Sequence, residues 1–169
     1  LVTGVQTCAL PIFTVGFNAQ LDYDLDAKTL SDCAKEGSLD ELIGAVRVYQ
    51  GDLLPGFYED WVLRERERLK HIYTDRIGRL LDKLIADQCW EHILDWGEHW
   101  IAKGQTPEPA YRALMVAHTH LGDVAAMAGA YRRCADALMD DLGVDPSPET
   151  QQYYEQLTQG NVNDAVPIN

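Results

Sequence analysis

The stretch that decides the fold is Tyr49-Gln-Gly-Asp-Leu-Leu-Pro-Gly-Phe-Tyr-Glu-Asp-Trp61, which runs into the charged segment Arg64-Glu-Arg-Glu-Arg-Leu69. It lies between two segments whose apolar residues recur with a helical period. Gly51 and Gly56 permit backbone angles that other residues resist, and Pro55 fixes φ and removes an N–H donor. The stretch therefore predicts a rigid turn between two helices.

The apolar residues of this stretch predict that the turn packs against the core. Trp61 is expected near the start of the second helix, and a tryptophan buries up to about 250 Å². We expect Trp61 and Leu54 to hold the turn against the preceding helix, near Tyr49 or Val46. Arg64, three residues further along, is expected beside them, either paired with an acid or exposed to a partner. A plain connector between helices is the alternative.

Composition and charge place the chain among ordinary globular proteins. Its 169 residues fit one domain, and 46% of them are hydrophobic and 24% charged. The net charge of −13 argues against DNA binding over the whole surface, because affinity for phosphate comes from Lys and Arg. Seven of the fourteen basic residues lie between Arg64 and Lys83, where the local charge is +3.

The cysteines and the apolar runs indicate where the protein works. Its four cysteines have no C-x-x-C spacing, which favours reduced thiols over a disulfide framework. No apolar run approaches the ~20 residues of a membrane span, and the first residues lack the positive charge of a secretory signal. We expect a cytoplasmic protein without membrane contact.

Residues 1–12 differ from the rest of the chain. They carry no charge and show neither helical nor strand periodicity. Residues 2–12 resemble the in-frame translation of a sequencing-library adapter, and a genuine apolar arm is the alternative. We interpret residues 1–12 as an artefact and exclude them from the fold.

Start and stop signals for helices recur along the remaining chain. Ser38 and Glu41 form a capping box, Asp26 is expected to cap the helix before it, and Thr106 is expected to cap a helix with Pro107 in its first turn. Gly143 is expected to end another helix. These signals and the apolar periodicity predict about seven helices, at 27–36, 38–49, 58–86, 90–101, 106–121, 124–142 and 147–157.

The spacing of the predicted helices is typical of a helical repeat. Helix pairs recur about every 35–40 residues, and the clearest unit runs over residues 111–139. The predicted fold class is all-α, a TPR-like helical-repeat domain (an α–α superhelix). Tyr131 is expected to be buried between the helices of its repeat. The candidate repeat-core residues are Leu114, Gly122, Asp123, Tyr131, Leu138, Gly143 and Pro146.

Three separated motifs resemble the bacterial transcriptional activator domain, the TPR-like module of SARP-type regulators. The first is the opening stretch, 49–69. The second is Leu-Gly-Asp at 121–123 followed by the helix 130–138, and the third is Asp-Leu-Gly-Val-Asp-Pro-Ser-Pro-Glu-Thr at 141–150. The resemblance assigns the family signature and a candidate interdomain contact to Tyr49, Gly51, Asp52, Leu54, Pro55, Gly56, Trp61, Arg64 and Arg68.

In that family the module follows a winged-helix DNA-binding domain, and we expect that domain to be absent from this sequence. The resemblance implies a linker, or the end of that domain, at 13–26 and the TPR-like module at 27–158. The sequence of residues 159–169 itself predicts a disordered tail. The resemblance also implies a non-catalytic regulatory and oligomerisation module of a transcription regulator. The expected partners are its own winged-helix domain and, as further candidates, a second protomer or RNA polymerase, with DNA contacted only through the missing domain. A generic TPR-like scaffold that binds a peptide is the alternative, and an accessory domain of an enzyme is a third.

The sequence carries no motif that predicts catalysis. It lacks G-x-S-x-G, the P-loop and G-x-G-x-x-G. Trp-Glu-His at 90–92 and Glu-His-Trp at 98–100 place acids beside histidines, but without the spacing of H-E-x-x-H. We interpret them as surface polar residues that flank buried tryptophans. The expectation is that the chain is not an enzyme and has no catalytic residue, cofactor or metal.

Overall fold

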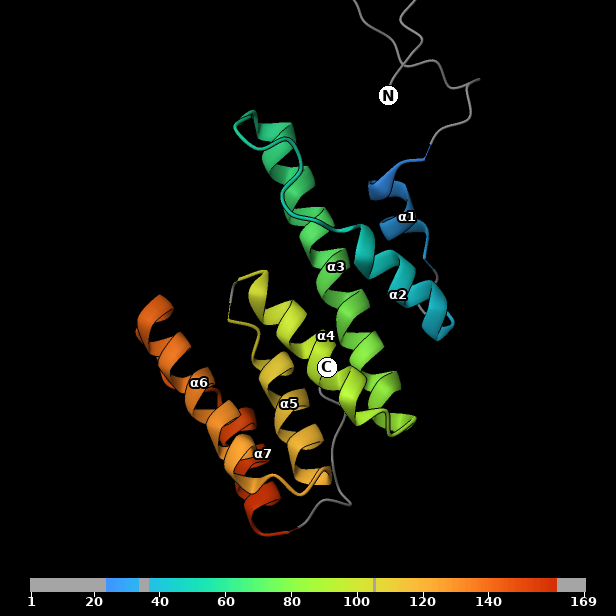
Figure 1. The fold of residues 1–169 in the computed structure, drawn as a ribbon. Coiled ribbons are helices and arrows are strands. Elements are labelled where there is room, and N and C mark those ends of the chain that lie inside the picture. The colour runs from blue at the N-terminus through green and yellow to red at the C-terminus, as the bar shows by residue number, and fades with distance from the viewer. Residues whose placement is uncertain (1–23, 34–36, 105, 161–169) are drawn as a thin grey trace, which may run out of the picture.

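The computed structural model describes residues 24–33, 37–104 and 106–160. Over these ranges the chain forms seven α-helices and no strand, which confirms the predicted all-α, TPR-like class (Figure 1). The expectations for residues 1–12, for most of the 13–26 segment and for residues 161–169 fall outside the described ranges. The helices are α1 (Asp26–Asp32), α2 (Leu39–Val48), α3 (Asp60–Ala86), α4 (Trp90–Ala102), α5 (Glu108–His120), α6 (Val124–Leu142) and α7 (Pro148–Thr158).

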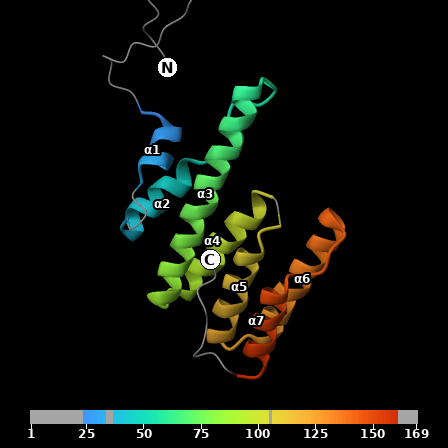
Figure 2. The same ribbon diagram turned by 180° about the vertical axis from the view of Figure 1, so that it is seen from behind.

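Helix α3 is the longest element, and the other helices are arranged on either side of it. Helices α1 and α2, which precede α3, pack together against it. Helix α4, which follows α3, also packs on it. Helices α4, α5 and α6 follow side by side, and α7 packs mainly against α5 (Figures 1 and 2). Each helix thus packs against helices one or two places away in the sequence, as in a helical repeat.

The apolar stripes merge into one main core that runs from α1 to α7. A smaller cluster of Tyr111, Cys134 and Leu138 lies between α5 and α6, with Ile101 of α4 against it. The main core contains the largest fully buried side chains, which are Leu30, Leu42, Val46, Ile77, Leu80, Leu81, Leu84, Ile93, Leu114, Met115 and Met127.

Most of the predicted helix boundaries are confirmed. The capping box at α2 is complete, because the Glu41 amide donates to the Ser38 hydroxyl (3.3 Å) and the Ser38 amide donates to the Glu41 carboxylate (2.7 Å). The side chains of Asp123 and Ser147 cap α6 and α7. Gly143 ends α6 with φ of +68°, a left-handed conformation that favours glycine.

Two predicted caps are wrong. Asp26 is the first helical residue of α1 and follows the cap position, which Leu25 occupies. Thr106 is not the cap of α5, because Pro107 takes that position. The Thr106 hydroxyl instead donates to the Asp141 carboxylate at the end of α6 (2.6 Å), a contact 35 residues away in sequence. A tertiary hydrogen bond has therefore replaced the local one.

The closing motif of the chain docks α7 onto α5. The hydroxyl and the amide of Ser147 donate to one carboxylate oxygen of Glu108, at 2.7 and 2.9 Å. The buried Arg112 donates to the hydroxyl of Thr150, which is fully buried (2.9 Å). Pro146, just before this network, is buried as well. The network satisfies polar groups that burial would otherwise leave without partners.

The hydrogen bonds at Glu108 make the stability of this junction depend on pH. Burial works to raise the pKa of Glu108, but hydrogen bonds with Thr150 and Ser147 and the charge of Arg112 together hold the pKa below its ordinary value of 4.5. A lowered pKa in the folded state gives stability that is present above the unfolded pKa and is lost as pH falls through the folded pKa.

We expect Glu108→Gln to have a lower free energy of unfolding than wild type at neutral pH. This gap in stability should narrow as the pH falls below about 4.5, because only the wild type has a carboxylate that becomes protonated. Urea unfolding at a series of pH values measures the gap. Glu91→Gln, at an exposed position of α4, is the control for losing one surface charge. A gap that stays constant with pH would contradict this account of the junction.

Candidate functional site

The connection between α2 and α3, residues 49–59, runs along the N-terminal half of α3 to its far end (Figure 1). The ring of Tyr49 stacks on the ring of Tyr73 in α3, with centroids 4.4 Å apart. Arg66 of α3 donates from Nε to the carbonyl oxygen of Leu53 (2.6 Å) and from Nη2 to that of Leu54. These contacts fix the connection against α3 at its start and in its middle.

A second helix also holds the connection. The ammonium of Lys103, just after α4, donates to the carbonyl oxygen of Gln50 (3.0 Å). Near the far end of α3 the chain reverses in a turn, where the Phe57 amide donates to the Leu54 carbonyl (3.1 Å). Gly56 in this turn has φ of +89°, which explains a glycine there. The connection between the two predicted helices is confirmed, and it is held against α3 and α4 along its first half.

The expected anchoring by Trp61 and Leu54 is wrong. Trp61 is 56% exposed and Leu54 is 41% exposed, so neither side chain pins the turn to α2. Val62, the next residue along α3, is fully buried instead. One residue turns the helix face by about 100°, so Val62 faces inward and Trp61 faces solvent. The anchors are the Arg66 hydrogen bonds and the Tyr49 stack, which bridge residues far apart in sequence.

Five large apolar side chains on either side of the start of α3 are exposed, and this group is here named the aromatic tip: Leu54, Phe57, Tyr58, Trp61 and Leu63. Phe57 is 54% and Tyr58 is 75% exposed, and the Arg66 guanidinium lies 5.9 Å from the centroid of the Tyr58 ring. Exposed apolar patches mark interaction sites, and Trp, Tyr and Arg are the residues most enriched at the centres of protein interfaces.

The two predicted arginines differ in their contacts. Arg64 is exposed on α3 and forms no ion pair within the described ranges. Arg68 forms a two-point contact with Glu65, at 2.9 Å from Nε and 2.7 Å from Nη2. Arg64 is therefore the arginine of the signature that is available to a partner next to Trp61.

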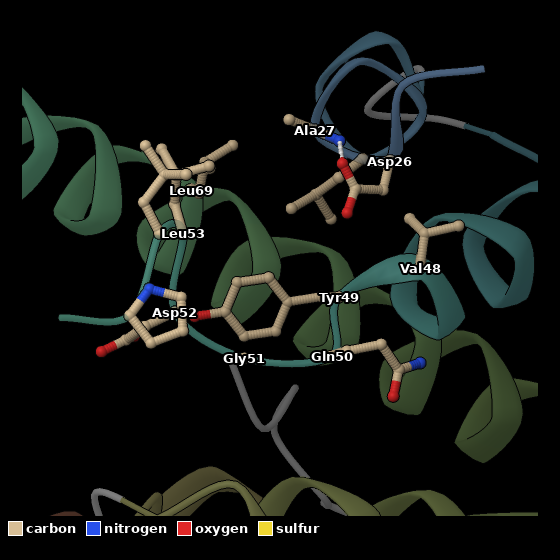
Figure 3. Close-up of a pocket in the computed structure, with 12 residues that line it drawn as sticks. Asp26, Ala27, Val48, Tyr49, Gln50, Gly51, Asp52, Leu53 and Leu69 are labelled. Atoms are coloured by element: carbon tan, nitrogen blue, oxygen red, sulfur yellow. Dashed lines mark hydrogen bonds between the residues drawn. The ribbon is translucent and has the colours of Figure 1, made fainter. Parts of the chain in front are cut away.

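Two cavities flank the connection. The first, of about 380 Å³, lies between the connection and α1, and Figure 3 shows Asp26 and Ala27 of α1 across from Tyr49 and Asp52. The second, of about 480 Å³, lies on the side of α3 and α4. Tyr49, Gly51 and Asp52 belong to the lining of both, so these signature residues form the partition between them.

The candidate repeat core divides into residues that are buried and residues that shape turns. Leu114 and Leu138 are buried. Gly122 has φ of +77° in the turn before α6, where Asp123 caps the helix. The expected burial of Tyr131 between the helices of its repeat is wrong, because its ring is only half-buried and stacks on Tyr154 of α7, with centroids 4.2 Å apart.

Sequence reasoning did not single out Tyr111 as the buried tyrosine of the repeat. Its ring is 4% exposed, and the guanidinium of Arg133 lies 5.9 Å from its centroid. Arg133 also forms a two-point ion pair with Glu98 of α4, at 2.6 and 2.8 Å. The available signal was the spacing of Tyr111 and Leu114, which puts both on one face of α5.

The described ranges contain no group of three or more His, Cys, Asp and Glu side chains that could hold a metal ion. In the same ranges, no helix is both long enough and apolar enough to cross a membrane. Of the histidines near the tryptophans, His92 is exposed, while His99 is half-buried with its ring edge-on to Trp96 at 5.3 Å.

The fold and this site define an all-α module of stacked helices with exposed aromatic side chains around the start of α3. The family model of the bacterial transcriptional activator domain matches residues 18–158, so the chain belongs to that family, and the resemblance of its three motifs is confirmed. The family is one of transcription-regulating domains and not of enzymes. Searches of curated proteins and of solved structures found no match to this chain.

Proposed function

We propose that this chain is the regulatory contact module of a bacterial transcription regulator, and that its aromatic tip holds the regulator's winged-helix DNA-binding domain. The observation that carries the proposal is that Phe57 and Tyr58 of the connection and Trp61 in the first turn of α3 are exposed. The connection beside them is already fixed by Arg66, Tyr49 and Lys103. Binding to a surface that is ordered beforehand costs less conformational entropy.

The entry point of the chain supports the winged-helix domain as the occupant. Asp26, at the start of α1, lines the first cavity together with Leu54 and Pro55 of the connection. A domain that precedes α1 would therefore be tethered beside the aromatic tip. The net charge of −13 makes the module itself a poor ligand for DNA, so DNA would be contacted through that domain, in the cytoplasm.

Other occupants remain as alternatives. A second protomer would make the module an oligomerisation domain, and RNA polymerase would make the aromatic tip an activating surface. A peptide-binding scaffold is the second candidate function, and the first cavity beside α1 is the observation that favours it.

We expect Trp61→Ala to stay folded, with a loss of at most about 1 kcal/mol, because the side chain is mostly exposed. Its affinity for the winged-helix domain should fall about tenfold or more, as for an aromatic at the centre of an interface. Arg64→Ala should also fold and weaken binding. Calorimetric titration of each variant with the winged-helix domain encoded upstream of residue 13 is the measurement.

Met139→Ala is the matched control, since Met139 is an exposed apolar residue on α6, outside the aromatic tip. It should bind like wild type. Wild-type affinity in Trp61→Ala, or a locus that encodes no winged-helix domain upstream, would contradict the proposal. Sedimentation of the chain alone measures whether it forms a dimer. A wild-type dimer that is lost in Trp61→Ala would show that the aromatic tip binds a second protomer.

A further inference from the structure

The second cavity has features that the proposed function does not use. It is bounded by residues 49–52 of the connection, by the middle of α3 and by the C-terminal end of α4. Its volume of about 480 Å³ is within the range of small-molecule sites in proteins. It is separate from the aromatic tip, none of whose residues line it.

The lining of this cavity carries positive charge in an acidic protein. Lys70 and Lys103 both line it, and neither forms an ion pair with any residue that the structure describes. Lys103 uses one donor on the Gln50 carbonyl, and an ammonium has three. Asp52 is the single carboxylate among the lining residues, so the lining is net positive while the chain as a whole carries −13.

The cavity also has an aromatic wall with an unpartnered hydroxyl. Trp100 and the stacked rings of Tyr49 and Tyr73 line it. Tyr73 is 3% exposed, and its hydroxyl has no hydrogen-bond partner within the described ranges. Burial raises the pKa of Tyr73, which keeps the hydroxyl a neutral donor. A buried polar atom without a partner is costly, and a bound ligand is one reason to retain it.

We propose that the second cavity binds a small organic anion with a planar apolar body. Lys70 and Lys103 would hold its carboxylate or phosphate group, and the body would lie against Trp100. Residues 50–52 also line the cavity, so an occupied cavity would tie the connection more firmly to α3 and α4. This inference does not depend on which protein occupies the aromatic tip.

Calorimetric titration with benzoate and with phenyl phosphate tests the proposal and distinguishes the two anionic groups. We expect saturable binding of at least one of them in the millimolar range or tighter, and none by benzyl alcohol, which has the ring without the charge. Chemical-shift changes in the amide spectrum should centre on residues 50–52, 74 and 103. No saturation by either anion below about 10 mM, or shifts centred on the aromatic tip, would overturn it.

Variants assign the roles of the lining residues. Lys70→Met should weaken binding about tenfold, the value of a charge-assisted hydrogen bond, and Lys70→Arg should restore most of it. Tyr73→Phe keeps the ring, so it should fold as stably as wild type or better while it binds more weakly. Lys28→Met, which removes the same charge from an exposed position on α1, is the control. An equal loss in Lys28→Met and Lys70→Met would overturn the proposal, because it would reflect overall charge.

Discussion

Leu114→Ala is expected to lower the free energy of unfolding by about 2–5 kcal/mol, the cost of a cavity in a closed core. Leu114 is 1% exposed, at the contact between α4 and α5. The contact is so close that a Cβ atom built on Gly97 of α4 would lie 2.8 Å from Cδ2 of Leu114. Urea unfolding followed by circular dichroism measures the loss. Leu142→Ala, at a position 66% exposed, should change stability by no more than about 0.5 kcal/mol.

The same contact gives a second, independent check. Gly97→Ala alone should destabilise the protein, because the added methyl group would force the buried Leu114 side chain to shift within the core. In the Leu114→Ala background that side chain is gone, so Gly97→Ala should cost less, and the helix propensity of alanine could make it favourable. Additive effects of the two substitutions would show that α4 and α5 do not pack as described.

Tyr111→Ala is expected to cost about 3–5 kcal/mol, because its ring fills the small cluster with Cys134 and Leu138. Tyr131→Ala should cost about 1–2 kcal/mol, since half-burial and one ring stack are lost. This order reverses the sequence-based expectation, in which Tyr131 was the buried tyrosine. Denaturant unfolding of both variants measures the difference.

Tyr58→Ala is the control for losing a tyrosine from an exposed position, and its stability should stay close to wild type. If Tyr131→Ala proved more costly than Tyr111→Ala, the positions of α6 and α7 around α5 would be wrong. The repeat register derived from the sequence would then be favoured again.

The sequence by itself determined the helices and the family. Capping boxes, left-handed glycines and apolar stripes act over three to seven residues, so the chain carries them whatever the rest of the fold does. The Ser38–Glu41 box, the Asp123 cap and the Gly143 stop are all found where these local rules place them. The three motifs also identified the family that the family model then matched over residues 18–158.

The tertiary structure decided which side chains on each helix are buried and which are exposed. Trp61 was expected to be buried because a tryptophan near the start of a helix is a good anchor. In the structure its neighbour Val62 faces inward instead, and Trp61 is exposed. The Thr106 hydroxyl, which was expected to cap α5, instead donates to Asp141, 35 residues away. The connection is held by hydrogen bonds from Arg66 to carbonyl oxygens 12 and 13 residues before it.

The two cavities were also decided by the tertiary structure, because each is lined by at least two elements that no local sequence pattern brings together. A local signal determines that a helix forms and where it ends. Which of its faces is covered depends on the helix that lies opposite, and that neighbour is chosen by the packing of the whole chain.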